Sequence, residues 1–492
     1  MMEKHVLSKS TFIKGTQCEK ALYLHKYRKE LRDELNVSQE AIFTQGTSVG
    51  ELACDLFPGG VDCTPKDYYK FQEAVKRTKD EIEKGTEVIY EAAFQFNGVL
   101  AALDILVKEG GEWKAYEVKS STSVSDTYVL DASIQYYTIV NSGIDLKDIS
   151  IVYINNQYVK DGDLDVRQLF NIESVLEKVQ IELPRIPNQV AYLKSILKSD
   201  DVPEKEIGGH CSSPYACDFR GHCWSHVPEY SVFNITRLNA NKKFELYDNG
   251  ILYLKDIPDD FPLNDNQRFQ VESEKSGEEI INRTEIRRFV EELNYPIYHL
   301  DYETFQLAVP VFDGTKPYQQ TVFQYSLHIK HKDGRIEHKE YLAEVNGVDP
   351  RKEFVRSLLQ DCGDFGDILV YNLGFEKSVT SKLVPVFPGD KLGLEKIISR
   401  LKDLMIPFQK RWYYTPKMQG RYSIKVVLPA LVPDLSYKDL NIQEGGTASS
   451  TFSSMIQGSF NGDLEQTRAD LLAYCKMDTW AMVKILEVLK KV

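Results

Sequence analysis

The chain has 492 residues, enough for two or three domains, and its apolar content of 42% is sufficient for sizeable cores. Its formal net charge of −13 argues against a protein that simply coats nucleic acid, but not against an enzyme that binds nucleic acid through local basic patches. There is no run of about 18 apolar residues. Nor is there an apolar stretch near the N-terminus. We therefore expect a cytoplasmic protein without a membrane anchor.

The first part of the chain predicts an α/β domain, because apolar residues at helical spacing alternate with short strand-like runs. We expect helices at 8–30, 38–57, 66–84 and 127–141, helical sequence over 164–199, and strands at 87–96, 99–107, 113–119 and 149–155. Gly110-Gly111 predicts a tight hairpin between two of these strands, since glycine adopts the positive backbone angles required. This order favours an α/β sandwich around a mixed sheet.

Charged residues lie on the two strands of the hairpin. Glu117 and Lys119 share one face of their strand, and pairing across the turn can bring Asp104 to the same face. Two carboxylates that hold Mg²⁺ or Mn²⁺, with a lysine that orients water or stabilises negative charge, suit metal-dependent hydrolysis of phosphodiesters. The alternative is a solvated hairpin with ordinary surface charges.

With the residues around it, this hairpin resembles the PD-(D/E)XK nucleases, in particular the RecB/AddB-like group that includes the CRISPR-associated adaptation exonucleases. The resemblance rests on Glu91, Asp104, Glu117, Lys119, Gln135 and Tyr136. It implies a restriction-endonuclease-like fold, metal binding by Asp104 and Glu117, and Lys119 as the catalytic lysine. It also implies that Gln135 and either Tyr136 or Tyr137 support the site or contact the substrate.

One ligand of that group is missing. The group usually has Gly-x-x-x-His on an early helix, and its histidine binds metal. In this chain Gly46 is followed by Gly50 at the histidine position. We expect Glu51 or Glu91 to act as the substitute ligand.

Three cysteines with regular spacing, Cys211, Cys217 and Cys223, close this part of the chain, and Cys18 lies far earlier. Eight cysteines in a cytosolic chain are poor candidates for disulfides, and a group of them indicates metal or reactive thiols. A zinc site with four cysteine ligands is one interpretation. His210 and His222 are candidate ligands, although such histidines more often lie around a site than in it. The remaining four cysteines are interpreted as ordinary: Cys54, Cys63, Cys362 and Cys475.

The RecB/AddB-like nucleases include a subgroup in which one N-terminal and three C-terminal cysteines hold a [4Fe-4S] cluster, and this arrangement is similar to it. The family more often spaces the last three as C-x2-C-x5-C, whereas here both gaps have five residues. The resemblance implies a cluster bound by Cys18, Cys211, Cys217 and Cys223 that ties the two ends of the domain together. We prefer the cluster to zinc.

Residues 228–292 are expected to be a connector with two short helices and a turn at Asn249-Gly250. They faintly resemble a helix-hairpin-helix element, but a packing linker is preferred. A second α/β domain is expected from residue 293. Its strands are predicted at 297–303, 320–330, 336–342 and 367–372, and its helices at 351–360, 375–384, 394–404 and 465–491.

Acidic residues recur in this second domain. Asp301 and Glu303 share one face of a strand, Glu376 follows on a helix, and Tyr474 and Asp478 share one face of a late helix. Carboxylates from these elements can converge on two metal ions about 3.5–4 Å apart, which clamp the attacking and leaving oxygens. The alternative is that these pairs are common and occur here by chance.

These residues resemble the DEDD exonucleases, such as the DnaQ-type proofreaders, which have an RNase H-like fold. Asp301-x-Glu303 matches the first motif, and Tyr474-x-x-x-Asp478 matches the tyrosine variant of the third. Asn372-x-x-x-Glu376 matches the second motif, with Glu where Asp is usual. The resemblance implies metal binding by the four acids, and a tyrosine that positions the attacking water.

Both halves together resemble a bacterial family of uncharacterised proteins with a RecB-like Fe–S nuclease half and an RNase H-like half. We therefore expect domains at 1–227, 228–292 and 293–492. The expected function is a nuclease with two metal-dependent sites, the second a 3′→5′ exonuclease, acting on DNA with a free end or on RNA. One alternative is a decayed protein that binds nucleic acid ends in a repair or anti-phage defence complex. The other is a zinc-stabilised regulator that binds no nucleic acid.

Overall fold

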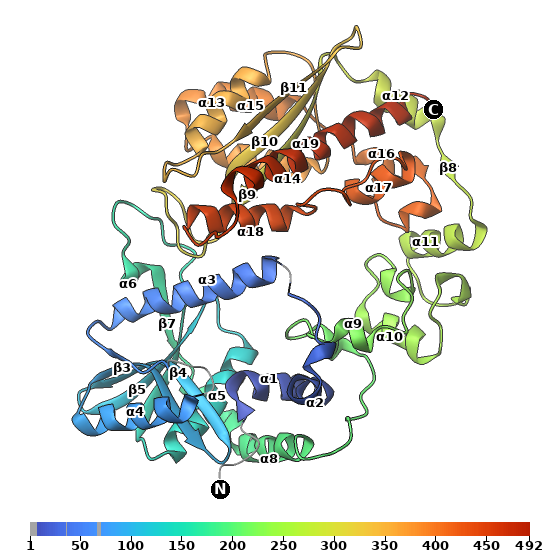
Figure 1. The fold of residues 1–492 in the computed structure, drawn as a ribbon. Helices are drawn as coiled ribbons and strands as arrows, with labels where there is room; N and C mark the ends of the chain where they lie inside the picture. The colour runs from blue at the N-terminus through green and yellow to red at the C-terminus, as the bar shows by residue number, and fades with distance from the viewer. Residues whose placement is uncertain (1–6, 36, 66–69) are drawn as a thin grey trace. The chain divides into compact units, whose positions relative to one another are not determined.

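The computed structural model describes residues 7–35, 37–65 and 70–492, which form a mixed α/β protein with several sheets (Figure 1). The chain divides into two compact units, Met1–His226 with Leu307–Tyr318, and Val227–Gln306 with Gln319–Val492. The expected connector at 228–292 lies within the second unit. The sequence did not predict that residues 307–318 belong to the first unit. No helix in the described ranges is long and apolar enough to span a membrane.

The first unit is built on one mixed sheet with the order β2-β3-β4-β5-β6-β7, and β1 pairs with β4. Its strands are β1 (Leu7–Ser8), β2 (Val61–Asp62), β3 (Val88–Phe96), β4 (Val99–Glu109), β5 (Glu112–Lys119), β6 (Leu146–Ile154) and β7 (Phe170–Ser174). Strands β3, β4 and β5 are antiparallel, whereas β6 runs parallel to β5. The expected hairpin turn is confirmed, because Gly110 and Gly111 have φ values of 59° and 89°.

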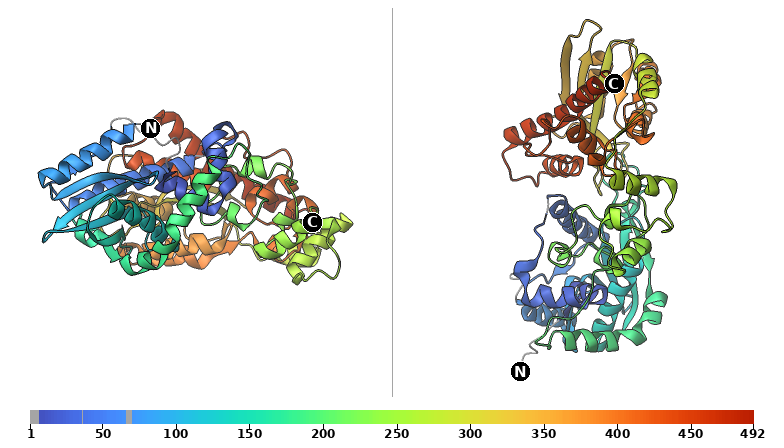
Figure 2. Two further views of the ribbon diagram at one scale, coloured as in Figure 1. Left: turned by 90° about the horizontal axis from the view of Figure 1, so that it is seen from below. Right: turned by 90° about the vertical axis from the view of Figure 1, so that its right-hand side faces the viewer.

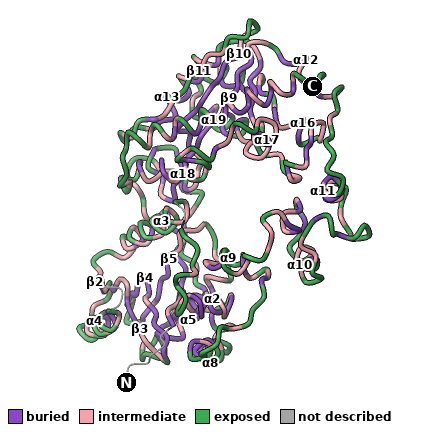
Figure 3. Tube along the Cα trace, turned by 45° about the vertical axis from the view of Figure 1, so that its right-hand side comes forward, coloured by how far each residue is buried: buried purple, intermediate pink, exposed green. Residues whose placement is uncertain are grey.

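Helices cover both faces of this sheet. The helices of the first unit are α1 (Lys9–Gln17), α2 (Glu19–Tyr27), α3 (Val37–Ala53), α4 (Phe71–Lys84), α5 (Asp126–Asn141), α6 (Val166–Leu169), α7 (Leu176–Glu182), α8 (Ile186–Ile196) and α9 (Arg220–Cys223). Helix α5 packs its apolar face on β3, β4 and β6, while Val49 and Ala53 of α3 pack with Ile105 and Tyr116 in a separate core. Figure 3 shows buried residues along the strands.

Two sequence predictions for this unit were wrong in detail. The helix expected at 8–30 is interrupted at Cys18, whose extended backbone ends α1 and whose sulfur accepts a hydrogen bond that caps α2. The helical stretch expected at 164–199 contains β7, which pairs with β6. The helix expected at 66–84 is observed from Phe71, and residues 66–69 lie outside the described residues.

The second unit contains a five-stranded sheet with the order β11-β10-β9-β12-β13. Its strands are β9 (Ile297–Phe305), β10 (Thr321–Lys330), β11 (Ile336–Leu342), β12 (Ile368–Val370) and β13 (Leu401–Asp403), and a small ribbon pairs β8 (Ile280–Ile281) with β14 (Tyr413–Tyr414). The first three strands are antiparallel, and β12 and β13 run parallel to β9. The strands predicted at 297–303, 320–330, 336–342 and 367–372 are confirmed within a few residues, whereas β13 was expected to be helical.

Helices lie on both faces of the second sheet (Figures 1 and 2). The helices of the whole second unit are α10 (Ala240–Asp248), α11 (Asp265–Ser276), α12 (Arg283–Glu291), α13 (Arg351–Asp361), α14 (Leu373–Leu383), α15 (Lys391–Arg400), α16 (Ile406–Gln409), α17 (Ile424–Leu431), α18 (Gly445–Ile456) and α19 (Leu464–Leu489). Of these, α10 and α11 pack in a separate small core. Helices α13, α14 and α15 pack on one face in the main core. Helix α19 covers the other face, where Thr479 bonds Ser326 and His328 of β10.

Candidate active sites

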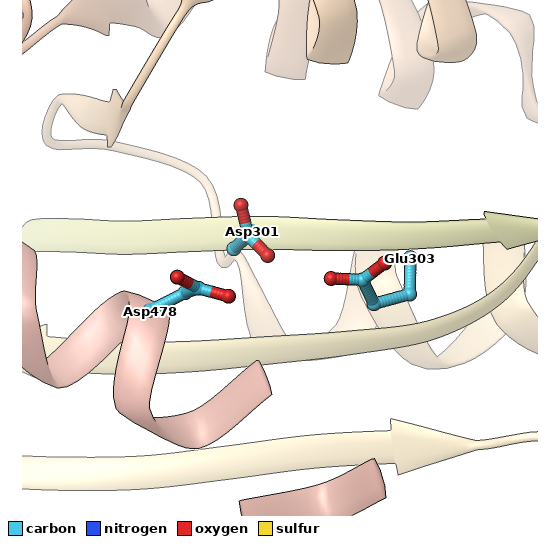
Figure 4. A group of neighbouring side chains, drawn as sticks. All are labelled: Asp301, Glu303 and Asp478. Carbon is cyan, nitrogen blue, oxygen red and sulfur yellow. The ribbon is translucent and has the colours of Figure 1, made fainter. Parts of the chain in front are cut away.

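Three carboxylates meet in the second unit, and we call Asp301, Glu303 and Asp478 the carboxylate cluster. Strand β9 carries Asp301 and Glu303 two residues apart on one face, and α19 supplies Asp478 from the adjoining helix. One oxygen from each lies within 4.8 Å of the others (Figure 4). In the described part of the chain, this is the one group of three or more acids, histidines or cysteines with ligand atoms so close together.

The fourth predicted acid, Glu376, is positioned by the start of α14. The chain turns sharply there, because Asn372 has a left-handed backbone with φ 86°. The carboxylate of Asp403 accepts hydrogen bonds from the backbone N–H groups of Asn372 and Leu373, both 3.2 Å long. Glu376 is only 2% exposed, and one of its oxygens has no hydrogen-bond partner. No oxygen of Glu376 lies within 4.8 Å of the ligand atoms of all three residues of the carboxylate cluster.

The four acids repel one another. Burial, with the charge of Asp478, raises the pKa of Glu303 to about 8. Burial, with the charges of Asp403 and Asp478, raises the pKa of Glu376 to about 8. Burial also raises the pKa of Asp478 to about 6, and burial with the charges of the other acids holds the pKa of Asp301 well above its ordinary range. Buried carboxylates crowded in this way require protons or cations between them.

Three groups beside the cluster complete its polar shell. Tyr437 donates a hydrogen bond of 2.6 Å to Asp478, and the ammonium of Lys425 lies 5.1 Å from the ring centre of the predicted Tyr474. Gly445, at the start of α18, is so close that an added Cβ would lie 3.6 Å from Glu303. Sequence patterns did not predict Tyr437 or Lys425, because Lys425 on α17 and Tyr437 between α17 and α18 match no spaced motif.

The donor set fits a divalent metal ion. It consists of carboxylate oxygens alone, which Mg²⁺ and Mn²⁺ prefer to nitrogen or sulfur. An oxygen of Glu376 is buried without a partner, and burial raises the pKa of all four acids. Both observations agree with a cation at this position.

In the first unit, the predicted carboxylates and lysine also come together. The backbone N–H of Val118 donates a hydrogen bond of 2.6 Å to Asp104, which aligns Asp104 with the end of β5. Lys119 donates to Glu117 at 2.7 Å. Glu91 lies opposite Asp104 where the pairing of β3 and β4 is interrupted, and its backbone has φ 52°. Burial raises the pKa of Glu91 and the nearby charge of Lys9 lowers it.

Two unpredicted residues belong to this group. Lys9, at the start of α1, donates to Glu117 at 2.7 Å and lies 3.9 Å from Asp104. Lys119 also donates to Asp131 of α5 at 2.6 Å. Burial would raise the pKa of Glu117, but Lys119 and Lys9 hold it well below its ordinary range. Burial and the charge of Glu117 raise the pKa of Asp104 to about 7.

The predicted site residues on helices α5 and α3 have different surroundings. Gln135 lies on α5 one turn after Asp131, is fully buried, and both polar atoms of its amide lack a partner. Tyr136 and Tyr137 make their hydrogen bonds elsewhere: the hydroxyl of Tyr136 donates to the carbonyl of Leu146, and that of Tyr137 accepts from Asn97. Glu51 is exposed on α3.

The four predicted cysteines line one small cavity of the first unit, together with His210. Two of the sulfur atoms accept backbone hydrogen bonds, Cys18 from Ala21 at 3.4 Å and Cys211 from Gly208 at 3.5 Å. No three of the four sulfur atoms lie within 4.8 Å of one another. Because tetrahedral zinc with bonds of about 2.3 Å holds its sulfur ligands about 3.8 Å apart, the thiols as placed do not fit a single zinc ion.

The second unit is thus a mixed α/β unit with a buried carboxylate cluster, the type of site that holds divalent cations in proteins. Residues 298–423 match a family described as a domain of unknown function (DUF2779). That stretch includes β9 and α14, but not α19 with Asp478.

Curated relatives are distant. An uncharacterised protein of Ureaplasma parvum is 26% identical over 215 residues, which are 39% of this chain and 31% of that protein. An uncharacterised protein of Mycoplasma pneumoniae is 28% identical over 207 residues, 38% of this chain and 31% of that protein. The match therefore spans about a third of the length of these relatives.

Proposed function

We propose that the second unit is a nuclease that hydrolyses phosphodiester bonds with Mg²⁺ or Mn²⁺, as a 3′→5′ exonuclease of the DEDD type. The observation that carries the proposal is the carboxylate cluster, with three buried or half-buried acids within 4.8 Å. The sheet supports an RNase H-like fold: counted along the unit, its strand order is 3-2-1-4-5, with the first three antiparallel and the last two parallel to the first.

In this proposal, Asp301, Glu303 and Asp478 hold the cations and Glu376 completes the set. The ions would lower the pKa of the attacking water and neutralise charge on the phosphate. The water oxygen bonds to phosphorus while the bond to the 3′-oxygen breaks, which releases a nucleoside 5′-monophosphate and a strand with a new 3′-hydroxyl. The proton lost by the water balances the proton gained by the 3′-oxygen.

Tyr474 acts as a hydrogen-bond donor in this mechanism. Burial and the neighbouring charge of Asp478 hold the pKa of its hydroxyl well above the ordinary range. The hydroxyl therefore keeps its proton at neutral pH and orients an oxygen of the substrate or the water, rather than accepting a proton from it. Lys425, close to the same ring, adds positive charge beside the substrate.

The test is digestion of a 5′-labelled single-stranded oligonucleotide with Mg²⁺ or Mn²⁺. Wild type should give products shortened from the 3′ end, and Asp301→Asn should be slower by about 100-fold or more because a ligand is lost. The matched control is Asp260→Asn, an exposed acid in the same unit. If Asp301→Asn shortens the oligonucleotide from its 3′ end as fast as this control, the proposed exonuclease is wrong.

We propose that the first unit is a second nuclease centre with a PD-(D/E)XK fold. Its sheet supports this: β3, β4 and β5 are antiparallel, α5 follows, and β6 returns parallel to β5. Asp104 and Glu117 would hold the cation; one oxygen of Glu117, and the amide of Gln135 on α5, are buried without partners. Lys119 would stabilise charge on the phosphate, with Lys9 as a second cation.

Digestion by this centre is measured with Asp301→Asn as the background, so that the second unit does not contribute. Adding Lys119→Met should remove the remaining activity, whereas adding Lys178→Met, an exposed lysine on α7, should not. The alternative is a decayed centre that binds nucleic acid ends without cutting. Binding of the oligonucleotide with no digestion by the Asp301→Asn background would favour this alternative.

We propose that Cys18, Cys211, Cys217 and Cys223 hold a [4Fe-4S] cluster. Four irons separate the thiolates more widely than one zinc ion, which agrees with sulfur atoms that line one cavity without close contact. Backbone donors to two of the sulfurs suit thiolates. The described cysteines are free, which supports a reducing, cytoplasmic location.

Anaerobically purified protein should be brown and contain iron and sulfide, and Cys217→Ser should lose both. Cys54→Ser is the control, because Cys54 lies outside the cavity. A colourless wild-type protein that contains zinc would show that the cluster is wrong.

A further inference from the structure

A cavity of about 240 Å³ lies in the second unit, and none of its lining residues belongs to the carboxylate cluster. One wall comes from residues 236–237 and 264–270, and the other from residues 408–422. Three arginines line it, Arg237, Arg411 and Arg421, and we call it the arginine pocket.

The arginine pocket is positively charged in an acidic protein. No carboxylate lines it, although the whole chain has a net charge of −13. The charge of Asp265 acts on Arg411 from outside the lining. Within the residues that the structure describes, none of the three guanidinium groups forms an ion pair with a carboxylate. Three arginines that line one cavity without an ion pair to a described residue indicate a negatively charged ligand.

Arg411 is held in a fixed orientation. Its guanidinium stacks on the ring of Phe269 with 4.0 Å to the ring centre, and it also donates to the side chain of Asn266. The backbones of Arg411 and Arg237 are left-handed, with φ 57° and 55°. A left-handed conformation is unfavourable for such residues, and strain of this kind concentrates at binding sites.

Hydrogen bonds join the two walls at residues next to Arg237 and Arg421. Gln270 donates to the carbonyl of Gln419 at 3.1 Å, and Thr236 donates to the carbonyl of Gly420 at 3.2 Å. A Cβ at Gly420 would come within 2.3 Å of Gln270, so this close approach requires glycine.

The same wall is connected to the proposed active site. The hydroxyl of Tyr371 donates to the carbonyl of Tyr422 at 2.7 Å. Tyr371 immediately precedes Asn372, the residue before α14, and the first turn of α14 carries Glu376. A ligand in the arginine pocket would thus contact a wall that is hydrogen-bonded to the chain segment carrying Glu376, the fourth acid of the proposed site.

We propose that the arginine pocket binds a backbone phosphate of the nucleic-acid strand, at a nucleotide away from the bond that is cut. This inference rests on the proposed nuclease function. Guanidinium groups match phosphate oxygens with two parallel hydrogen bonds, and the amides of Asn264 and Gln409 and the ring of Tyr422 suit the attached nucleoside.

The test uses Arg237→Gln with Arg421→Gln in the full chain, because both side chains are exposed and their loss should leave the fold intact. The control is Arg283→Gln with Arg287→Gln, which removes the same charge from exposed positions on α12. Binding of a fluorescent single-stranded oligonucleotide is measured by anisotropy in EDTA, over a series of salt concentrations.

The pocket variant should bind about 10-fold more weakly than the control. Its plot of log affinity against log salt should be shallower by about 0.7 for each phosphate that the arginines no longer neutralise. Hydrolysis of a nitrophenyl ester of a single nucleotide, which cannot reach both sites, should be unchanged. Equal affinity and equal salt dependence in the two variants would overturn the proposal.

Competition by inorganic phosphate and by a nucleoside monophosphate separates a strand phosphate from a small free ligand. If either small molecule binds wild type but not the pocket variant, while oligonucleotide binding is unaffected by the substitutions, the pocket takes a free ligand and the proposal is wrong. Because binding is measured without metal, a wild-type protein that binds through the pocket but hydrolyses nothing would contradict the nuclease function alone.

Discussion

Tyr437 connects a loop to a proposed metal ligand through one hydroxyl. Its hydrogen bond of 2.6 Å fixes one oxygen of Asp478, which is 41 residues away in the chain. Loss of a hydrogen bond to a metal ligand typically costs 10–100-fold in metal affinity or activity. We therefore predict that Tyr437→Phe lowers the rate of digestion by about 10–100-fold at limiting Mg²⁺, and less at saturating Mg²⁺.

The readout is the dependence of rate on Mg²⁺ concentration, which a merely structural defect would not shift. Tyr253→Phe, at a tyrosine that is 49% exposed, serves as the control. Tyr437→Phe with an unchanged Mg²⁺ dependence would remove Tyr437 from the site.

The raised pKa values of the cluster predict an unusual dependence of stability on pH. The pKa values of Glu303 and Glu376 are raised from 4.5 to about 8. Between these two pH values, the metal-free folded state therefore binds more protons than the unfolded chain. The free energy of unfolding of the metal-free protein should therefore fall as pH rises through this range. Burial also lowers the pKa of His328 from 6.5 to about 3. The titration of His328 therefore changes the free energy of unfolding only below about pH 6.5.

The comparison is therefore made between pH 6.5 and pH 8, by thermal unfolding in EDTA and in Mn²⁺. The cation replaces the protons, so it should raise the melting temperature more at pH 8 than at pH 6.5. Asp301→Asn should remove most of this gain, and Asp260→Asn should not. A melting temperature of the metal-free protein that rises with pH over this interval would contradict the prediction.

Sequence patterns predicted the residues of the site that lie in short motifs. Asp301 and Glu303 are two apart on a strand, and Tyr474 and Asp478 are four apart on a helix, so local periodicity alone gives their common face. Lys9 could not be predicted in this way, because it meets Glu117 across 108 residues. No spacing rule connects residues that only the folded chain brings together.

At the scale of elements, the start of β12 depends on one glycine. Gly366 has φ 89°, and an added Cβ would lie 2.1 Å from the carbonyl oxygen of Pro296. The left-handed backbone costs a larger residue about 1–2 kcal/mol. The clash adds about 1–3 kcal/mol. We predict that Gly366→Ala lowers the free energy of unfolding of the second unit by about 2–5 kcal/mol.

Gly334→Ala is the matched control, since Gly334 has φ 92° and no atom within 4 Å of an added Cβ. Gly334→Ala should lower the free energy of unfolding only by the cost of the left-handed backbone, about 1–2 kcal/mol. Native-state hydrogen exchange of β9 and β12 gives both values. Equal losses in the two variants would show that Pro296 moves aside without cost.

Long elements were predictable where periodicity was strong, and short ones were not. The strands around the hairpin of the first unit and the helix α19 were found within a few residues of their observed bounds. Strand β13 has only three residues, and it is extended because it pairs with β12, which a local pattern does not record. Cys18 interrupts the expected first helix, where an extended backbone replaces a helical one.

At the scale of the whole chain, one segment has a place that its sequence position does not indicate. Residues 307–318 lie between β9 and β10 but belong to the first unit. There Ala308 is 1% exposed in the core with Ile105, and Asp313 accepts a hydrogen bond of 2.7 Å from Lys160. The hydroxyl of Tyr318 is hydrogen-bonded to that of Ser120, the residue after the proposed catalytic lysine.

The segment should therefore stabilise the first unit rather than the second. Ala308→Asp would bury a carboxylate among apolar side chains, which costs about 3–5 kcal/mol when the charge has no partner. We predict faster hydrogen exchange in β4 and β5, and unchanged exchange in β9 and β10, when peptides of the full-length protein are compared by mass spectrometry. Val311→Asp, in the same segment but 39% exposed, should change neither. Faster exchange confined to β9 and β10 would assign residues 307–318 to the second unit instead.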